Sequence, residues 1–185
     1  HQPDMKMIYI SADDFASRLV EAISNNRVRA FRNRFRNAGI LMIDDIQFLA
    51  GKERAQEEFF NIFNALFQAR KQIVITSDRP PKELAHLEKR LRSRLGSDIV
   101  VDIQPPDQET REAILRRDRA AMRKEDKAPD EVIQAIAAAI ETNVRELKAA
   151  FRQVLAMADV SGQPVTVEMA RQALSRLRGS DRNET

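Results

Sequence analysis

Two adjacent carboxylates follow a short apolar run near the middle of the chain, Ile40-Leu41-Met42-Ile43-Asp44-Asp45. Four consecutive apolar residues are typical of a fully buried strand in a parallel sheet. Such sheets bind ligands outside the carboxyl ends of their strands, where these two acids lie. In nucleotide-hydrolysing folds, one acid there holds Mg²⁺ and a second orients or activates the attacking water. The same pair also fits an ordinary turn or helix cap.

Two further polar residues stand at suggestive positions. Asp78 follows the next predicted strand, Gln72 to Thr76. Because parallel strands end at the same edge of a sheet, we expect Asp78 to lie near Asp44 and Asp45, although it also fits a turn. Arg145 follows a plausible helix N-cap, where a cation opposes the helix dipole. That position suggests contact with an anionic ligand, and a tolerated surface residue is the alternative.

Arginine is concentrated in two segments, although 31 basic and 28 acidic residues give a net charge of only +3. The first segment, residues 27–36, holds Arg27, Arg29, Arg32, Arg34 and Arg36 and no acid. The second holds Lys89, Arg90, Arg92 and Arg94. Clustered arginine forms either an electrostatic footprint for phosphate or simply a solvated helix face.

The elements that must position these residues alternate between strand and helix in the first half of the chain, which predicts an α/β domain with a parallel sheet. Strands are expected over about 7–10, 40–43, 72–76 and 98–103. Helices are expected over about 12–25, 28–37 and 53–70, followed by a helical stretch from Pro80. Gln104-Pro105-Pro106 breaks the pattern. Helices then follow over about 108–124, 130–141, 144–159 and 167–178.

This pattern divides the chain into an α/β domain over 1–104, a helical bundle over 105–178 and a disordered tail over 179–185. The 185 residues contain no cysteine, which excludes disulfides, cysteine-ligated metals and thiol catalysis. No apolar run approaches the ~18 residues of a membrane span, and no signal-peptide pattern is present. We therefore expect a soluble, cytoplasmic protein.

Several motifs in fixed order carry a family resemblance. They are Ile43–Arg54 (IDDIQFLAGKER), Gln56–Phe60 (QEEFF), Ser77–Glu83 (SDRPPKE), Arg90–Arg94 (RLRSR), Asp102–Pro106 (DIQPP) and Asn143–Leu147 (NVREL). Together they closely resemble the ATPase (AAA+) domain of bacterial DnaA replication initiators, over about residues 7–178. The resemblance implies a partial AAA+ P-loop NTPase-type parallel sheet followed by a small all-α lid.

The resemblance also implies roles for matching positions. Asp44 and Asp45 match the Walker B pair for Mg²⁺ and water activation, and Asp78 matches sensor 1. Arg94 matches the arginine finger that reaches ATP in a neighbouring subunit, with Arg90 beside it, and Arg145 matches the sensor 2 arginine of the lid. Residues 12–36 resemble the initiator-specific insertion. Val20, Lys52 and Arg54 match positions that line the path of single-stranded DNA.

By the same resemblance, we expect ATP or ADP with Mg²⁺ as cofactors and origin DNA, single- and double-stranded, as a partner. The resemblance further implies ATP-dependent assembly into a homo-oligomeric filament, with the replicative helicase and acidic phospholipids as possible partners. Ala55 departs from the family, which usually has Ser or Thr there. Leu95-Gly96-Ser97-Asp98 and Lys148-Ala149 depart from it as well.

The sequence contains no Gly-x-x-x-x-Gly-Lys-Ser/Thr phosphate loop, because Gly51-Lys52 is followed by Glu53. We also find no helix-turn-helix module of the kind that follows in the family. The chain alone is therefore expected to bind ATP weakly and to be inactive, which leaves hydrolysis undecided. The alternative function is a non-hydrolysing DnaA-like adaptor or regulatory inactivator of initiation.

Overall fold

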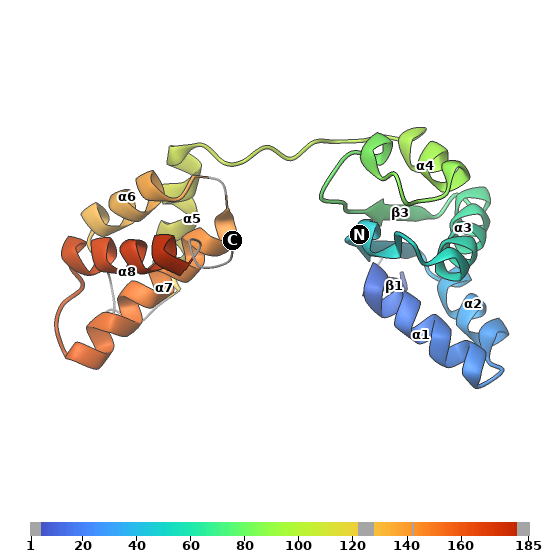
Figure 1. Ribbon diagram of the computed structural model, residues 1–185, viewed down its shortest axis with the longest axis horizontal. Helices are drawn as coiled ribbons and strands as arrows, with labels where there is room; N and C mark the ends of the chain where they lie inside the picture. The colour runs from blue at the N-terminus through green and yellow to red at the C-terminus, as the bar shows by residue number, and fades with distance from the viewer. Residues whose placement is uncertain (1–4, 122–127, 142, 181–185) are drawn as a thin grey trace. The chain divides into compact units, whose positions relative to one another are not determined.

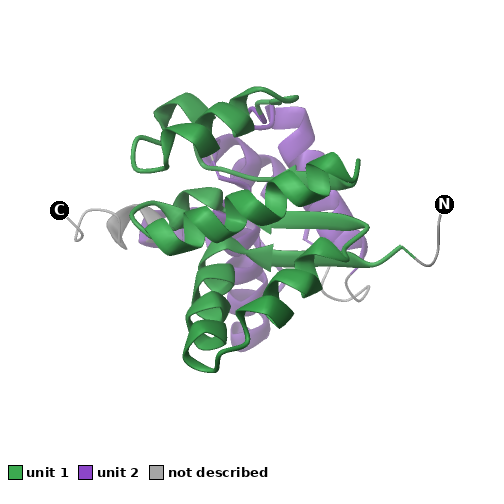
Figure 2. Cartoon of the chain, turned by 90° about the vertical axis from the view of Figure 1, so that its right-hand side faces the viewer, with its two compact units in different colours: residues 1–102 green, residues 103–185 purple. Residues whose placement is uncertain are grey.

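The computed structural model describes residues 5–121, 128–141 and 143–180. The chain divides into an α/β unit, residues 1–102, and a helical unit, residues 103–185, which are coloured separately in Figure 2. The division falls beside the breaker at Gln104-Pro105-Pro106. Figure 1 labels most of the elements. In the α/β unit they are β1 (Met7–Ser11), α1 (Ala12–Ser24), α2 (Val28–Arg36), β2 (Ile40–Asp44), η1 (Ile46–Leu49), α3 (Glu53–Gln68), β3 (Gln72–Ile75), η2 (Pro81–Glu83) and α4 (Lys89–Gly96).

The α/β unit is built on a three-stranded parallel sheet with the order β1-β2-β3. The helices α1 and α2 connect β1 to β2, and α3 connects β2 to β3. Cα partners run from Met7↔Ile40 to Ser11↔Asp44 between the first two strands. They run from Ile40↔Gln72 to Ile43↔Ile75 between the second and third. The predicted parallel sheet is therefore confirmed.

The sheet is covered more fully on one face than on the other. Ile8, Ile10, Leu41 and Ile43 point into the core and are at most 7% exposed. On the opposite face, Met7 and Tyr9 are 62% and 64% exposed, and Val74 is 39% exposed. The expectation of a fully buried strand at 40–43 is wrong for Ile40 and Met42, which are only half-buried. Alternate residues of a strand face opposite sides, and the described helices bury only one side.

An aromatic cluster joins α1, α2 and α3 within the core of the α/β unit. The ring of Phe15 on α1 lies 5.2 Å from Phe31 and 5.3 Å from Phe35, both on α2. Its centroid is also 5.8 Å from that of Phe59 on α3. Ser11 caps α1 by accepting a hydrogen bond from the Asp14 amide at 3.1 Å, as its sequence position predicts. Local capping and aromatic packing together fix the first helix beside the sheet.

The strand expected over 98–103 does not form. Residues 99–103 are exposed and irregular, and Ile99 and Ile103 are each 89% exposed. The segment is rich in β-branched residues, but a strand also needs a neighbouring strand to receive its backbone hydrogen bonds. No strand among the described residues pairs with it. Propensity alone therefore did not decide the structure of this segment.

The helical unit contains α5 (Gln108–Ala120), α6 (Asp130–Ala139), α7 (Val144–Ser161) and α8 (Val167–Ser180). They match the four expected helices, although α5 and α6 end earlier than predicted, and residues 122–127 lie outside the description. Gly179 and Ser180, expected in a disordered tail, belong to α8, and 181–185 are not described. The core is formed by side chains such as Leu115, Val132, Leu147 and Phe151, all fully buried.

Candidate nucleotide site and nucleic-acid surface

Asp44 ends the central strand and is held by hydroxyl groups from both neighbouring strands. The pairing of Ile43 with Ile75 places the next residues, Asp44 and Thr76, side by side. The Thr76 hydroxyl donates a short hydrogen bond to Asp44 Oδ1, and the Tyr9 hydroxyl on β1 donates to Asp44 Oδ2 at 2.6 Å. These two contacts fix the orientation of the carboxylate at the carboxyl edge of the sheet.

The Asp44 carboxylate raises the pKa of Tyr9, because the Tyr9 hydroxyl donates a hydrogen bond to it and because the negative charge opposes phenolate formation. Asp45 adds a smaller effect in the same direction. Tyr9 therefore remains a neutral donor at physiological pH. A neutral donor orients the carboxylate without neutralising it, which suits this carboxylate to a site for a cation.

Asp45 and Asp78 are joined through Gln47. Asp45 has a left-handed backbone, with φ 56° and ψ 57°, and its amide donates to the Thr76 hydroxyl oxygen at 2.9 Å. Gln47 Nε2 donates to Asp45 Oδ1 at 3.1 Å, and Gln47 Oε1 accepts from the Asp78 amide at 3.4 Å. The backbone of Asp78 thus lies next to the site, as its position after β3 predicted.

The Asp78 carboxylate itself is paired with its neighbour. Arg79 Nε and Nη2 donate to its two oxygens at 3.0 and 2.8 Å. The Arg79 guanidinium lowers the pKa of Asp78, first through these hydrogen bonds and then through its charge. Asp78 is therefore ionised, and any contact of its carboxylate with a ligand requires this exposed pair to open.

The donor set at this edge fits Mg²⁺ coordination. Mg²⁺ in nucleotide sites is held by one or two carboxylates, with water and phosphate oxygens completing the shell. Asp44 and Asp45 supply such carboxylates, while the described part of the chain holds no group of three or more His, Cys, Asp or Glu arranged for a metal. The site thus suits a metal that arrives with a phosphate ligand.

Sequence reasoning missed three residues of this site: Tyr9, Gln47 and Thr76. Thr76 left a usable signal, because it ends a predicted strand directly beside the strand that ends in Asp44. Gln47 follows the two acids closely but lies in a 3-10 turn that pattern analysis did not detect. Tyr9 left no signal, since only the register of β1 with β2 places it near Asp44.

The two arginines predicted to meet phosphate from a second subunit lie on α4. Buried Gln56 holds the start of this helix: its Nε2 donates to the Leu49 and His86 carbonyls, and its Oε1 accepts from the Glu88 amide. Arg90 Nε donates to Glu88 at 2.5 Å. Arg94 instead lies over the ring of Phe67, with its Cζ 3.8 Å from the ring centroid.

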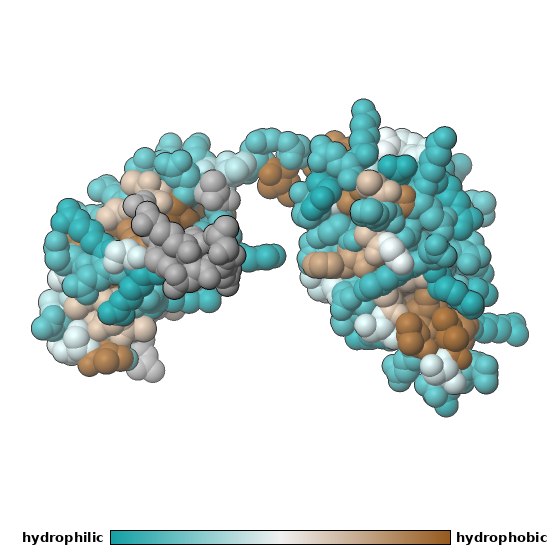
Figure 3. Space-filling view, in the orientation of Figure 1, coloured by the Kyte–Doolittle hydropathy of each residue, from teal (hydrophilic) through white to brown (hydrophobic). Residues whose placement is uncertain are grey.

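The residues predicted to line a DNA path gather on α1 and at the start of α3. Lys52 Nζ forms an ion pair with Asp13 Oδ1 on α1 at 2.7 Å, which joins the two elements. Lys52 is thus paired with an acid of a different helix, not with an acid of α3. Val20 on α1 is 64% exposed and Ile23 is 36% exposed, and Figure 3 shows hydrophobic surface over this helix. Arg54 is exposed on α3.

Arg145 lies in the helical unit. Asn143 caps α7, because its Oδ1 accepts from the Arg145 amide at 2.9 Å and from the Glu146 amide at 3.3 Å. The N-cap inferred from the sequence is therefore confirmed, and Arg145 lies in the first turn of the helix.

None of the helices in the described ranges is long and apolar enough to cross a membrane.

A parallel sheet with paired carboxylates at its carboxyl edge, followed in the chain by a helical unit, fits the AAA+ class of nucleotide-binding folds that the family resemblance implies. Residues 1–102 match the family model for the bacterial DnaA ATPase domain. The chromosomal replication initiator protein DnaA of Symbiobacterium thermophilum is 51% identical over 174 residues, which cover 94% of this chain and 38% of that protein. The chain belongs to the bacterial DnaA ATPase-domain family.

Solved structures agree with this assignment. Domain III of DnaA from Thermotoga maritima superposes with a TM-score of 0.87 at 34% identity, covering 95% of this chain and 73% of that one. A replication initiator DnaA bound to AMPPCP and single-stranded DNA gives a TM-score of 0.73 at 34% identity, over 97% and 51% of the two chains. The chain spans well under half the length of the curated relative described above.

Proposed function

We propose that this chain is the nucleotide- and DNA-engaging core of a bacterial replication initiator. In this proposal ATP or ADP binds with Mg²⁺ at the edge of the sheet, copies of the protein assemble in the ATP state, and the assembly holds single-stranded origin DNA. The cytoplasm is the expected location. The observation that carries the proposal is the connected set of Asp44, Thr76, Asp45, Gln47 and Asp78 at the carboxyl edge of the sheet.

The nucleotide part of the proposal gives each acid a distinct task. Asp44, oriented by two hydroxyls, holds the metal, which draws electron density from the phosphate oxygens when bound. Asp45 orients the attacking water, and Asp78, once it leaves Arg79, accepts a hydrogen bond from that water or from a water bound to the metal. The related DnaA structure bound to AMPPCP, an ATP analogue, supports nucleotide binding.

The nucleotide part is tested in a fusion that joins the phosphate-loop segment of a DnaA relative ahead of Met5. We expect Asp44→Asn to weaken Mg²⁺-dependent ATP binding, measured by calorimetry. Asp45→Asn should spare binding and slow hydrolysis by at least about 10²-fold, measured as phosphate release. Asp130→Asn, a carboxylate substitution in the helical unit, serves as the control. Unimpaired hydrolysis by Asp45→Asn would refute the assigned role of Asp45.

The DNA part rests on the exposed surface formed by α1 and the start of α3. Lys52 and Arg54 supply positive charge for the phosphate backbone, and Val20 supplies an apolar contact beside it. Grooves that bind single strands combine charge that follows the backbone with apolar or aromatic contacts to bases. The Lys52–Asp13 ion pair competes with DNA for Lys52, so Asp13 sets how readily that lysine engages a phosphate.

Salt titration of single-strand binding by the ATP-bound fusion tests the DNA part. Lys52→Ala and Arg54→Ala should each weaken binding and flatten the log–log salt slope by about 0.7. Asp13→Asn should strengthen binding, because it frees Lys52 and removes a negative charge. Arg171→Ala, which removes an exposed arginine of α8, should leave the slope unchanged. Lowered thermal stability of the Lys52 and Arg54 variants with unaltered slopes would show that these residues are structural.

A further inference from the structure

Arg94 lies on an aromatic surface formed by two phenylalanines of α3. Its Cζ is 3.8 Å from the centroid of Phe67 and 5.7 Å from that of Phe63. The two rings are nearly parallel, with centroids 6.3 Å apart and an angle of 12° between their planes. They are four positions apart on one helix, with three residues between them, so they lie on the same helix face. Phe67 is 45% exposed, which places this contact at the surface of the α/β unit.

The charge of Arg94 has no carboxylate partner among the described residues, as their ion pairs do not include it. Its Nε is buried without a hydrogen bond. Arg90, on the same helix, stacks on Phe60 with its Cζ 4.8 Å from the ring centroid, but its Nε also pairs with Glu88. Arg90 and Arg94 thus lie one turn apart, and each contacts an aromatic ring. Arg90 is also paired with a carboxylate, whereas Arg94 is not paired with one among the described residues.

A ring and a carboxylate hold a guanidinium in different ways. A carboxylate binds the N–H edge of the group and offsets its charge. An aromatic ring attracts the face of the group and leaves the N–H donors at its edge available. The Arg94 Cζ lies only 3.8 Å from the Phe67 centroid, the separation expected when the face of the guanidinium rests on the ring, so we infer that its terminal N–H groups can still bind a second, anionic partner. Leucine at position 67 would fill similar space but offer no such face.

We propose that Phe67, supported by Phe63, is a positioning residue that holds the Arg94 guanidinium ready for a phosphate oxygen of ATP bound to a neighbouring copy. The part that concerns ATP rests on the proposed function. The part that concerns the ring and the guanidinium rests on the geometry of this unit alone. Phe67 thereby determines how well Arg94 acts, without itself touching the nucleotide.

The first test measures the position of the Arg94 side chain in this protein without the fused phosphate-loop segment. NMR should show the Arg94 side-chain protons shifted upfield by the ring current of Phe67, relative to those of Arg29, an exposed arginine of α2. Phe67→Tyr, which keeps the ring, should preserve this shift, and Phe67→Leu should abolish it. An unchanged Arg94 shift in Phe67→Leu overturns the proposal.

The second test measures function in the nucleotide-binding fusion. Phe67→Leu should lower ATP-dependent assembly and hydrolysis by up to about 10²-fold, the cost of a misplaced catalytic group, with ATP affinity unchanged. Phe67→Tyr should restore both. If Arg94→Ala impairs both activities and Phe67→Leu does not, the positioning role of Phe67 is overturned. If Arg94→Ala has no effect, the arginine-finger role that the family resemblance implies for Arg94 fails, while the NMR result still decides the ring–guanidinium contact.

Discussion

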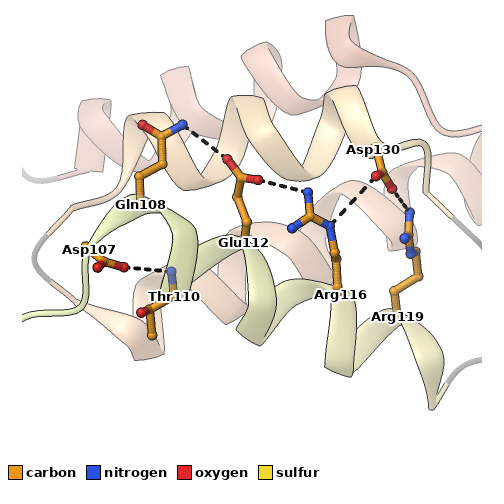
Figure 4. A network of polar contacts seen from close by, with 7 residues as sticks. All are labelled: Asp107, Gln108, Thr110, Glu112, Arg116, Arg119 and Asp130. Carbon is orange, nitrogen blue, oxygen red and sulfur yellow. Dashed lines mark hydrogen bonds and ion pairs between the residues drawn. The ribbon is translucent and has the colours of Figure 1, made fainter.

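Two carboxylates, one in each unit of this protein, are held by different kinds of partner. At the edge of the sheet, Asp44 accepts hydrogen bonds from the hydroxyls of Tyr9 and Thr76. In the helical unit, Asp130 at the start of α6 accepts from Arg119 Nη1 at 2.5 Å and pairs with Arg116 Nε at 3.7 Å, both on α5. Figure 4 shows this second arrangement, which joins two helices.

This difference indicates that the Asp44 carboxylate is positioned for a ligand, whereas the Asp130 carboxylate stabilises the fold. A hydroxyl orients a carboxylate but leaves its charge in place, whereas a guanidinium offsets that charge. Asp44 therefore remains suited to a cation, while Asp130 is already matched with two arginines. The four variants described next alter contacts in the two units, and the one expected to lower the free energy of unfolding most comes first.

The largest effect is expected from Arg111, the buried arginine of the helical unit. Its Nε donates to the Ala137 carbonyl at 2.8 Å, and its Nη1 donates to the Pro106 carbonyl at 2.7 Å. Arg111→Met should cost about 2–4 kcal/mol in the free energy of unfolding, because two charge-assisted hydrogen bonds are lost and buried carbonyls remain. Urea unfolding followed by circular dichroism measures this. Arg117→Met, exposed on the same helix, should change it by at most about 0.5 kcal/mol.

Arg32 tests whether cation-paired carboxylates stabilise only the helical unit or also the α/β unit away from the ligand site. It forms a bidentate pair with Glu58, with both N–O distances 2.6 Å, and Glu58 is only 5% exposed. Arg32→Ala should cost about 1–3 kcal/mol, because the Glu58 carboxylate stays buried without its partner. Adding Glu58→Met should recover much of this loss in the same unfolding assay. A loss below about 0.5 kcal/mol in Arg32→Ala would mean that the pair does not support the α/β unit.

Asp130 should show its framework role through pH. The hydrogen bond from Arg119 lowers the pKa of Asp130, and the charges of Arg119 and Arg116 add to this effect. The ionised carboxylate therefore stabilises the fold above its ordinary pKa of about 3.9, and this contribution disappears as pH falls through the lowered folded value. The difference in urea midpoint between the wild type and Asp130→Asn should be constant above about pH 5 and shrink in more acidic solution. A difference that grows toward acid would contradict the assigned direction.

The smallest effect is spectroscopic and concerns the site itself. Tyr9 is the only tyrosine in the chain, which also lacks tryptophan, so phenolate absorbance reports on this residue alone. Its titration should lie above the ordinary pKa of about 10, because Asp44 raises the pKa of Tyr9. Asp44→Asn should bring the pKa back toward 10, while Asp130→Asn should leave it unchanged. A Tyr9 pKa insensitive to Asp44→Asn would exclude the contact between them.

Much of the fold was predictable because its signals are local. Ser11 and Asn143 mark helix starts through a side chain that reaches a nearby amide, and both caps are present. The helices expected over 12–25 and 53–70 and those expected in the second unit correspond to α1, α3 and α5 to α8. The segment 98–103 was mispredicted because strand formation depends on a partner strand, which a local pattern does not reveal.

The sequence by itself determined the alternation of strands and helices, the break at Gln104-Pro105-Pro106 and the placement of Asp44 and Asp45 at a strand end. Each depends on residues close together in the chain. Only the tertiary structure decided which groups surround those acids, because strand register brings Tyr9 and Thr76 to Asp44 across 35 and 32 residues. It likewise decided that Lys52 pairs with Asp13 and that Arg94 stacks on Phe67. Contacts of that kind depend on how separate elements pack, and no spacing rule within one element specifies them.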